Sequence, residues 1–253
     1  EIGDTVINKC IEALGRIRAG IQLLVEDDTA FDAFCFMNRS MILQRNIMNF
    51  SKKHGAGIEC AFRDFVDPRD PSNNFGWRPF QIAFILINLK GIVDPEHDNR
   101  EVVDLLYFPT GGGKTEAYLG LMAFVIANRR LRAEENDEYN RDGGVTAILR
   151  YTLRLLTTQQ RDRITKMILA AELIRQKEYP KYGKEPISIG FWVGGTVTPN
   201  TFKELEEAPE DPAKTRIARS KKNSIYKQLL TCPFCGKPLT EENFYIDIPT
   251  KSV

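Results

Sequence analysis

The sequence has little of what several classes of protein require. Five of its 253 residues are cysteine and two are histidine. Only one cysteine pair is closely spaced, which excludes a disulfide framework and favours a reducing, cytoplasmic location. No apolar run approaches the length of a membrane span, and no secretory signal opens the chain. The formal net charge is +1, so any contact with nucleic acid must come from a local basic face rather than from bulk charge.

The chain also lacks internal repeats and low-complexity tracts. It opens at Glu1 without a methionine and stops at Val253, shortly after its close cysteine pair. We therefore expect it to be a piece of a longer protein. Its hydrophobic content of 42% and charged content of 27% are ordinary for a folded domain.

The most informative segment is residues 108–115, Phe-Pro-Thr-Gly-Gly-Gly-Lys-Thr. It follows an apolar run at 102–107 and precedes a helical pattern, which is the layout of a phosphate-binding loop. Glycines allow backbone amides to surround a phosphate, and the helix N-terminus adds partial positive charge. The residues predicted to hold ATP phosphates are Thr110, Gly111, Gly112, Gly113, Lys114 and Thr115.

Within this loop, Lys114 would reach the β- and γ-phosphates and Thr115 would ligate Mg²⁺. The general pattern has a glycine where this chain has Phe108. The alternative reading is a Gly-rich turn with a chance Lys-Thr pair.

The apolar pattern predicts an α/β fold. Strands are expected at 102–107, 145–149 and 187–193, because these are short apolar runs bounded by turn residues. Helical spacing predicts helices at 5–25, 30–53, 115–131 and 156–177, and another that opens at Trp77–Gln81 and runs through Leu89. Alternating strands and helices indicate a parallel sheet with flanking helices, whose strand ends would converge on one site.

The Gln81 side chain is a candidate for recognising adenine, because its amide can both donate and accept a hydrogen bond. Phe80, or its neighbours Trp77 and Arg78, would stack against the base. The alternative is a glutamine that merely lies at a helix N-terminus.

Two further segments are candidates for binding the phosphate backbone of one DNA strand. Thr152, Arg154, Thr157 and Gln159 follow the second predicted strand, and Gly194, Gly195 and Thr196 follow the third. The alternatives are a capped amphipathic helix and a plain strand-to-loop turn. A basic run at 214–222 would either face nucleic acid or form a solvated helix face.

Cys232 and Cys235, in Cys-Pro-Phe-Cys-Gly, have the spacing of half a zinc knuckle. Zinc needs four ligands, so we expect a second pair beyond Val253. A bare turn is the alternative, and a redox pair is a weaker one because the cysteines do not open a helix after a strand.

Together, Trp-Arg-Pro-Phe-Gln, Pro-Thr-Gly-Gly-Gly-Lys-Thr, Arg-Tyr-Thr-Leu-Arg-Leu-Leu-Thr and the later Gly-Gly-Thr resemble the nucleotide- and DNA-binding motifs of superfamily 2 helicases. More narrowly, they resemble the helicase subunits of the bacterial DISARM anti-phage defence system. The resemblance implies a RecA-like P-loop NTPase domain that uses ATP and Mg²⁺ to move on DNA, with other defence-system subunits as partners.

The resemblance divides the chain into a helical N-terminal region at 1–65, a first motor domain at 66–200 and a helical insertion with the half zinc knuckle at 201–253. The acidic Asp-Glu pair that should follow the last DNA motif is missing. We therefore expect the chain by itself to bind nucleotide weakly and to hydrolyse almost none. The alternatives to an ATP-driven helicase or translocase are a nucleotide-gated DNA-binding module and an assembly subunit.

Overall fold

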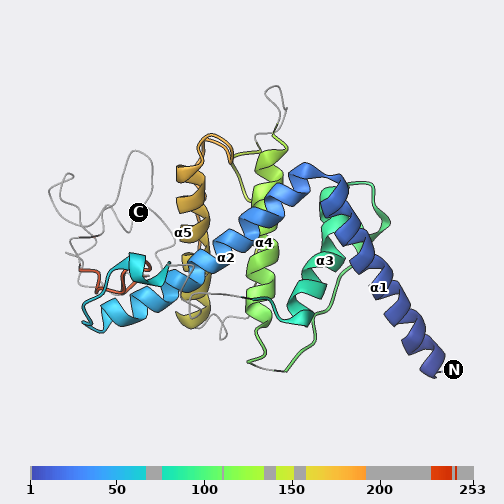
Figure 1. Ribbon diagram of the computed structural model, residues 1–253, viewed down its shortest axis with the longest axis horizontal. Coiled ribbons are helices and arrows are strands. Elements are labelled where there is room, and N and C mark those ends of the chain that lie inside the picture. Colours follow the sequence, from blue (N-terminus) through green and yellow to red (C-terminus); the bar gives the residue numbers. More distant parts are fainter. Residues whose placement is uncertain are drawn as a thin grey trace, which may run out of the picture. The chain divides into compact units, whose positions relative to one another are not determined.

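The computed structural model describes residues 2–66, 76–109, 111–133, 141–150, 158–191, 229–240 and 243 (Figure 1). Within these ranges the α-helices are α1 (Ile2–Glu26), α2 (Asp28–Gly55), α3 (Pro79–Val93), α4 (Lys114–Leu131) and α5 (Thr158–Lys177). Two 3-10 turns, η1 (Phe62–Phe65) and η3 (Asp98–Glu101), lie between them. The helical ranges predicted from apolar spacing are confirmed to within a few residues at each end.

The chain divides into two compact units. The first contains residues 1–46 and 65–188, and the second contains residues 47–64 and 189–253. The three-part division expected from the sequence stays a prediction.

The first unit is built by helices that pack in succession, α1 on α3, α3 on α4 and α4 on α5. Gly20 lets α1 approach α3 closely, because a Cβ there would lie 2.1 Å from the Leu86 carbonyl oxygen. The junction between α1 and α2 is capped by Asp27, whose carboxylate accepts the Ala30 amide hydrogen at 2.9 Å. The fully buried core side chains include Phe36, Met37, Met41, Leu89, Leu119, Phe124 and Met167.

The predicted parallel sheet is wrong. None of the residues that the structure describes forms a named strand, and the one isolated β-bridge lies between Thr231 and Pro238. The segments 102–107 and 145–149 belong to no helix or strand, and the described part of the third, 187–191, is also outside any ladder. The residues that the structure describes therefore do not form the parallel-sheet, RecA-like architecture expected from the motifs.

The physical reason is that a strand needs a neighbouring backbone, and apolar alternation cannot supply one. In segment 102–107 the side chains of Val103, Leu105 and Tyr107 are 94%, 88% and 88% exposed. Asp104, on the other face, is held by Arg16 of α1 through contacts of 2.7 and 2.6 Å. The segment is thus anchored to a helix by an ion pair, and its apolar side faces solvent.

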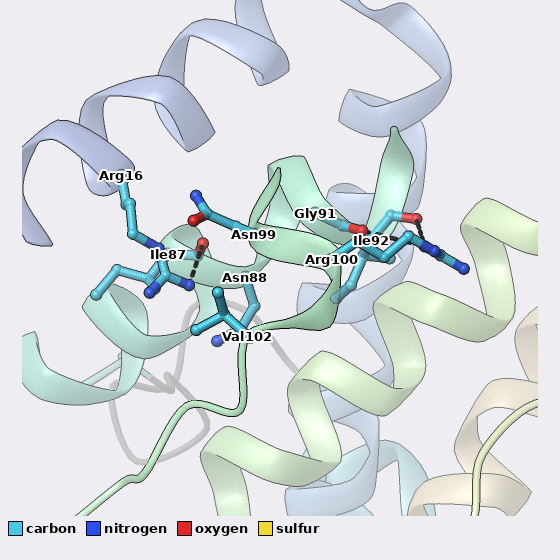
Figure 2. A pocket seen from close by; sticks show the side chains of 8 residues that line it. All are labelled: Arg16, Ile87, Asn88, Gly91, Ile92, Asn99, Arg100 and Val102. Atoms are coloured by element: carbon cyan, nitrogen blue, oxygen red, sulfur yellow. Dashed lines mark hydrogen bonds between the residues drawn. The ribbon is translucent and has the colours of Figure 1, made fainter. Parts of the chain in front are cut away.

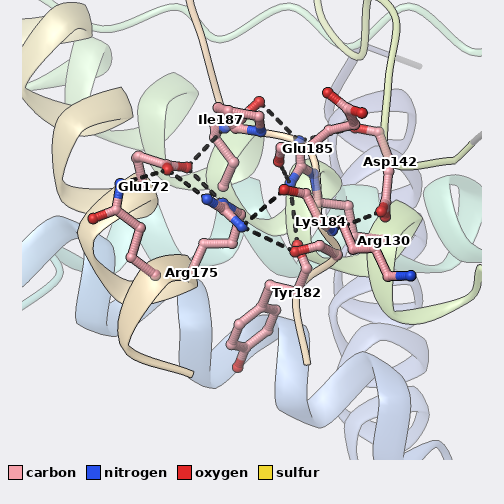
Figure 3. A network of polar contacts seen from close by, with 11 residues as sticks. Arg130, Asp142, Glu172, Arg175, Tyr182, Lys184, Glu185 and Ile187 are labelled. Carbon is pink, nitrogen blue, oxygen red and sulfur yellow. Dashed lines mark hydrogen bonds and ion pairs between the residues drawn. The ribbon is translucent and has the colours of Figure 1, made fainter. Parts of the chain in front are cut away.

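A polar network joins α4, α5 and the turn at 182–187 (Figure 3). Arg130 donates to the carbonyl oxygens of Tyr182 at 3.0 Å and Glu185 at 2.6 Å. Arg175 forms two hydrogen bonds of 2.7 Å with Glu172, which also accepts the Ile187 amide hydrogen at 2.8 Å. These side-chain contacts hold the turn at 182–187 against α4 and α5.

Burial by itself would raise the pKa of Glu172. Its hydrogen bonds from Arg175 and from the Ile187 amide outweigh burial and hold that pKa below its ordinary value. Burial lowers the pKa of Arg130. Protonation of Glu172 at low pH is therefore expected to weaken this network.

Among the helices that the structure describes, none has both the length and the apolar character needed to cross a membrane.

Candidate phosphate-binding site

The predicted phosphate loop leads directly into α4, whose first residue is Lys114. Gly113, the N-cap residue, has φ +92° and ψ +25°, and Gly111 has φ +79°. Both values lie in the left-handed region, which side chains with a Cβ rarely adopt. The glycines therefore let the chain turn sharply into the helix, where the first amides and the helix dipole favour an anion. Thr110 lies outside the described residues.

Lys114 is folded over the loop that precedes it. Its ammonium donates to the carbonyl oxygen of Phe108 and, at 3.2 Å, to that of Pro109. The Pro109 carbonyl also accepts the Gly112 amide hydrogen at 3.1 Å. Hydrogen bonds within the segment thus close the loop, and two of its carbonyl oxygens accept from the Lys114 ammonium.

Two side chains at the start of α3 donate hydrogen bonds to carbonyl oxygens of the loop. Arg78 donates to the Gly112 carbonyl at 2.7 Å, and the Gln81 amide donates to the Gly113 carbonyl at 2.7 Å. The Gln81 side-chain oxygen accepts the Arg78 backbone hydrogen at 2.9 Å. Both ends of the Gln81 amide are therefore engaged within the protein, and contact with adenine would require these bonds to be exchanged.

Phe80 stacks on Phe108, with ring centroids 3.9 Å apart and planes 12° apart. Phe108 stands where the general loop pattern has glycine, and its ring also lies against Gly112, where an added Cβ would be 2.7 Å from it. One face of the Phe80 ring is therefore covered by the loop itself. The predicted adenine contact of Phe80 stays a prediction.

Trp77 fastens the start of α3 to two other helices. Its indole N–H donates to the Asn38 side chain of α2 at 2.7 Å. Its ring lies against Gly120 of α4, where a Cβ would come within 2.5 Å of it. This packing explains why Arg78 and Gln81 meet the loop that begins the same helix α4.

The first turn of α4 is also linked to α5. The Thr115 hydroxyl donates to the Gln160 side-chain oxygen at 3.3 Å, and Arg163 forms an ion pair of 2.9 Å with Glu116. The second Glu116 carboxylate oxygen is buried and has no hydrogen-bond partner within the described part of the chain. A buried, unmatched acceptor is costly unless a ligand, ion or water supplies a donor.

These links show which site residues the motifs did not indicate. The Arg78 side chain contacts the loop, and its predicted stacking against the base stays a prediction. Gln160, Glu116 and Arg163 were not among the predicted residues. Gln160 could have been suspected because it directly follows Gln159, which was predicted to bind DNA. No comparable signal marked Glu116 or Arg163.

The predicted DNA contacts lie mostly outside the described residues. This applies to Thr152, Arg154 and Thr157, and also to Gly194, Gly195 and Thr196. Gln159 belongs to α5, but its side chain is outside the described part. These assignments therefore stay predictions.

A separate cavity of about 300 Å³ lies among α1, α3 and η3 (Figure 2). Its two arginines are engaged in the protein, Arg16 with Asp104 and Arg100 with the Gly91 carbonyl at 3.1 Å. The hydrogen bond with Asp104 raises the pKa of Arg16. The cavity is lined by Arg16, Ile87, Asn88, Gly91, Ile92, Asn99, Arg100 and Val102, none of which was predicted to contact a ligand.

In the second unit, Cys232 and Cys235 are free and half-buried. Across the described residues, no three His, Cys, Asp or Glu side chains are arranged to hold a metal ion. The described residues thus contain two of the four ligands expected for zinc, Cys232 and Cys235, and the zinc site stays a prediction.

Comparison with known proteins identifies a related sequence. No family model matches the chain. The chain is 46% identical over 255 aligned residues, which include its whole length, to DISARM protein DrmA of Bacillus paralicheniformis (strain ATCC 9945a / NCIMB 11709 / CD-2). It spans 22% of that protein's length. The chain is therefore related along its entire length to a segment of a DISARM protein.

Proposed function

We propose that the protein carrying this chain is an ATP-dependent DNA helicase or translocase subunit of a bacterial anti-phage defence system. The relationship to DISARM protein DrmA supports the defence role. The loop at the start of α4, closed around the Lys114 ammonium, supports nucleotide binding and is the observation on which the proposal rests.

In this proposal Lys114 exchanges its two carbonyl partners for oxygens of the β- and γ-phosphates. The left-handed Gly111 and Gly113 keep the loop backbone free of side chains where it meets the phosphates. Bound Mg²⁺ would supply charge neutralisation at the phosphates. Thr115 contributes its hydroxyl to that ion, and Gln160 orients the hydroxyl by accepting its hydrogen.

The loop is held in shape before nucleotide arrives. Arg78 and Gln81 fix two successive loop carbonyls, at Gly112 and Gly113. A preorganised loop loses less conformational entropy on binding, so these two side chains act on affinity through the loop. The stacked Phe80–Phe108 pair offers an aromatic surface beside it for the base.

DNA would be bound by the two segments that follow the loop in sequence. The proposed contacts are Thr152, Arg154, Thr157, Gln159, Gly194, Gly195 and Thr196. Hydroxyls, backbone amides at glycine and an arginine suit a phosphate backbone rather than base edges. The sequence after residue 200 contains no Asp-Glu pair of the kind that orients an attacking water in helicases, so hydrolysis would depend on carboxylates supplied elsewhere in the protein.

The test is ATP hydrolysis by the protein that carries this chain, measured with and without single- and double-stranded DNA. Lys114→Ala is expected to abolish DNA-stimulated turnover, because the variant loses the charge that meets the phosphates. Lys177→Ala, at the exposed end of α5, is the matched control and should keep full activity. Undiminished turnover in Lys114→Ala would remove the proposal.

A second candidate is an assembly subunit in which nucleotide stabilises a complex. It is favoured by an apolar stripe on α1 at helical spacing. The exposed fractions are 58% for Ile7, 62% for Ile11, 46% for Leu14, 48% for Ile21 and 73% for Val25. A non-hydrolysable ATP analogue that supports full activity would favour this candidate, or the nucleotide-gated DNA-binding module, over a motor.

A further inference from the structure

The turn at Cys232–Cys235 has a defined geometry in the second unit. The Cys232 amide donates to the Lys237 carbonyl at 2.8 Å, and the Gly236 amide donates to the Cys232 carbonyl at 2.8 Å. The Leu239 amide donates to the Leu230 carbonyl at 2.9 Å, beside the bridge between Thr231 and Pro238. Both cysteines therefore lie in the tip of a short hairpin whose ends are held together.

Gly236, directly after the second cysteine, is required for two reasons. Its φ of +74° is in the left-handed region. A Cβ there would also lie 2.1 Å from the Ser51 carbonyl oxygen of α2. The hairpin tip thus packs on helix backbone at a distance that only glycine permits.

The turn packs on an aromatic cluster. Phe234, between the two cysteines, lies 5.4 Å from Phe50 and 5.0 Å from Phe62, measured between ring centroids. Phe50 and Phe62 are 5.5 Å apart. This aromatic packing holds the turn in place, and Cys232 and Cys235 remain half-buried.

His54 holds the backbone of the second cysteine. Its Nδ1 lies 2.8 Å from the Cys235 carbonyl oxygen, and its ring is 5.0 Å from Phe50. Because a carbonyl can only accept, Nδ1 must carry the hydrogen. His54 is thus a positioning residue that acts on the Cys235 backbone.

We propose that Cys232 and Cys235 are two of the four ligands of a structural zinc ion, in a turn that His54 and the aromatic cluster hold in place. A Cys-x-x-Cys spacing in a tight turn is how structural zinc sites take two ligands from one segment. On binding, each thiol releases its proton to solvent and the thiolate sulfur donates to zinc, with no change of oxidation state.

The other two ligands must come from outside the described residues. No three potential ligands converge within those residues, and the chain has no cysteine or histidine after Cys235. The chain spans 22% of its DrmA relative, so a longer protein has ample sequence for a second pair. A redox role fits the geometry less well, since the pair does not begin a helix.

The experiment is metal analysis of the protein that carries this chain, purified without added metal. We expect the wild type to retain one more equivalent of zinc than the Cys232→Ser/Cys235→Ser variant. Cys10→Ser, at an exposed cysteine of α1, is the matched control and should retain the full amount. Equal zinc in the wild type and the double variant would overturn the proposal.

A second measurement guards against a double variant that simply fails to fold. Cobalt exchanged into the wild type should give a sulfur-to-cobalt charge-transfer band, and its absence would also overturn the proposal. His54→Ala should weaken retention of zinc against a chelator roughly 10- to 100-fold, as loss of a supporting contact does. His54→Gln keeps an N–H donor and should recover part of that loss. A wild-type chelation profile in His54→Ala would refute the positioning role of His54.

Discussion

Replacing Gln81 by alanine separates two roles that one side chain can have. The side chain is 3% exposed, and its amide bridges the Arg78 backbone hydrogen and the Gly113 carbonyl. If its role is to support the loop, its loss should weaken the binding of every nucleoside triphosphate equally. If it reads adenine, its loss should weaken ATP and leave GTP unchanged.

The contacts of Gln81 support the loop-supporting role, and the expected loss of stability and affinity follows from the number of hydrogen bonds removed. Gln81→Ala removes two hydrogen bonds, each with a net contribution of about 0.5–1.5 kcal/mol. We therefore expect a loss of about 1–3 kcal/mol in the free energy of unfolding. The bond to Gly113 alone acts on the loop, so the affinity for both ATP and GTP should fall roughly 2- to 12-fold.

The assay is a pair of binding titrations with ATP and GTP, accompanied by denaturant unfolding of the same variants. Gln81→Glu keeps the acceptor for Arg78 but places a carboxylate against the Gly113 carbonyl, so it should weaken both nucleotides at least as much. Gln22→Ala, on α1 where the side chain bonds only Glu26 among the contacts described, is the control. A loss confined to ATP would refute the loop-support reasoning.

Two further predictions concern stability. Gly113→Ala should lower the free energy of unfolding by about 1–3 kcal/mol, because it places a Cβ on a residue with φ +92° and within 2.8 Å of Gln81 Nε2. Chemical denaturation measures this change. The control is Gly15→Ala, in open space on α1, which should be neutral or stabilising. The lowered pKa of Glu172 stabilises the fold above its ordinary value of 4.5, and this contribution is lost as the pH falls through the folded pKa. Glu172→Gln should therefore be less stable than wild type at pH 7 and lose less stability as the pH is lowered. Thermal melts across this pH range measure the effect, with the exposed Glu185→Gln as control. An equal loss of stability with falling pH in wild type and Glu172→Gln would contradict this.

The helices were predictable because each carries its own evidence. Apolar spacing in α1, α2, α4 and α5 marks one face, and Pro79 and Gly113 mark the starts of α3 and α4. Helical hydrogen bonds are made within the segment, so local sequence is sufficient to predict them.

The strands could not be predicted in the same way. The run at 102–107 has the β-branched and aromatic residues of a buried strand, yet a ladder depends on a partner that the run itself does not encode. What decides its position is Asp104, whose ion pair with Arg16 joins residues 88 positions apart. Such long-range pairs leave no periodic signal in the sequence.

The candidate site was predictable as a motif but not as a set of contacts. The glycines and Lys114 predict a phosphate loop because their backbone and charge requirements are local. The roles of Arg78 and Gln81 depend on α3 packing against α4 through Trp77 and Gly120. The link from Glu116 to Arg163 likewise depends on how two helices meet, which residue type alone does not reveal.

The solvent-facing residues of segment 102–107 have a consequence for how the chain is handled in the cell. Val103, Leu105 and Tyr107 present an exposed aliphatic and aromatic row, and exposed apolar stretches are the kind that holdase chaperones bind and that nucleate aggregation. During synthesis this row leaves the ribosome before the loop at 108–115. The yield of folded protein is therefore expected to depend on how soon that row is covered.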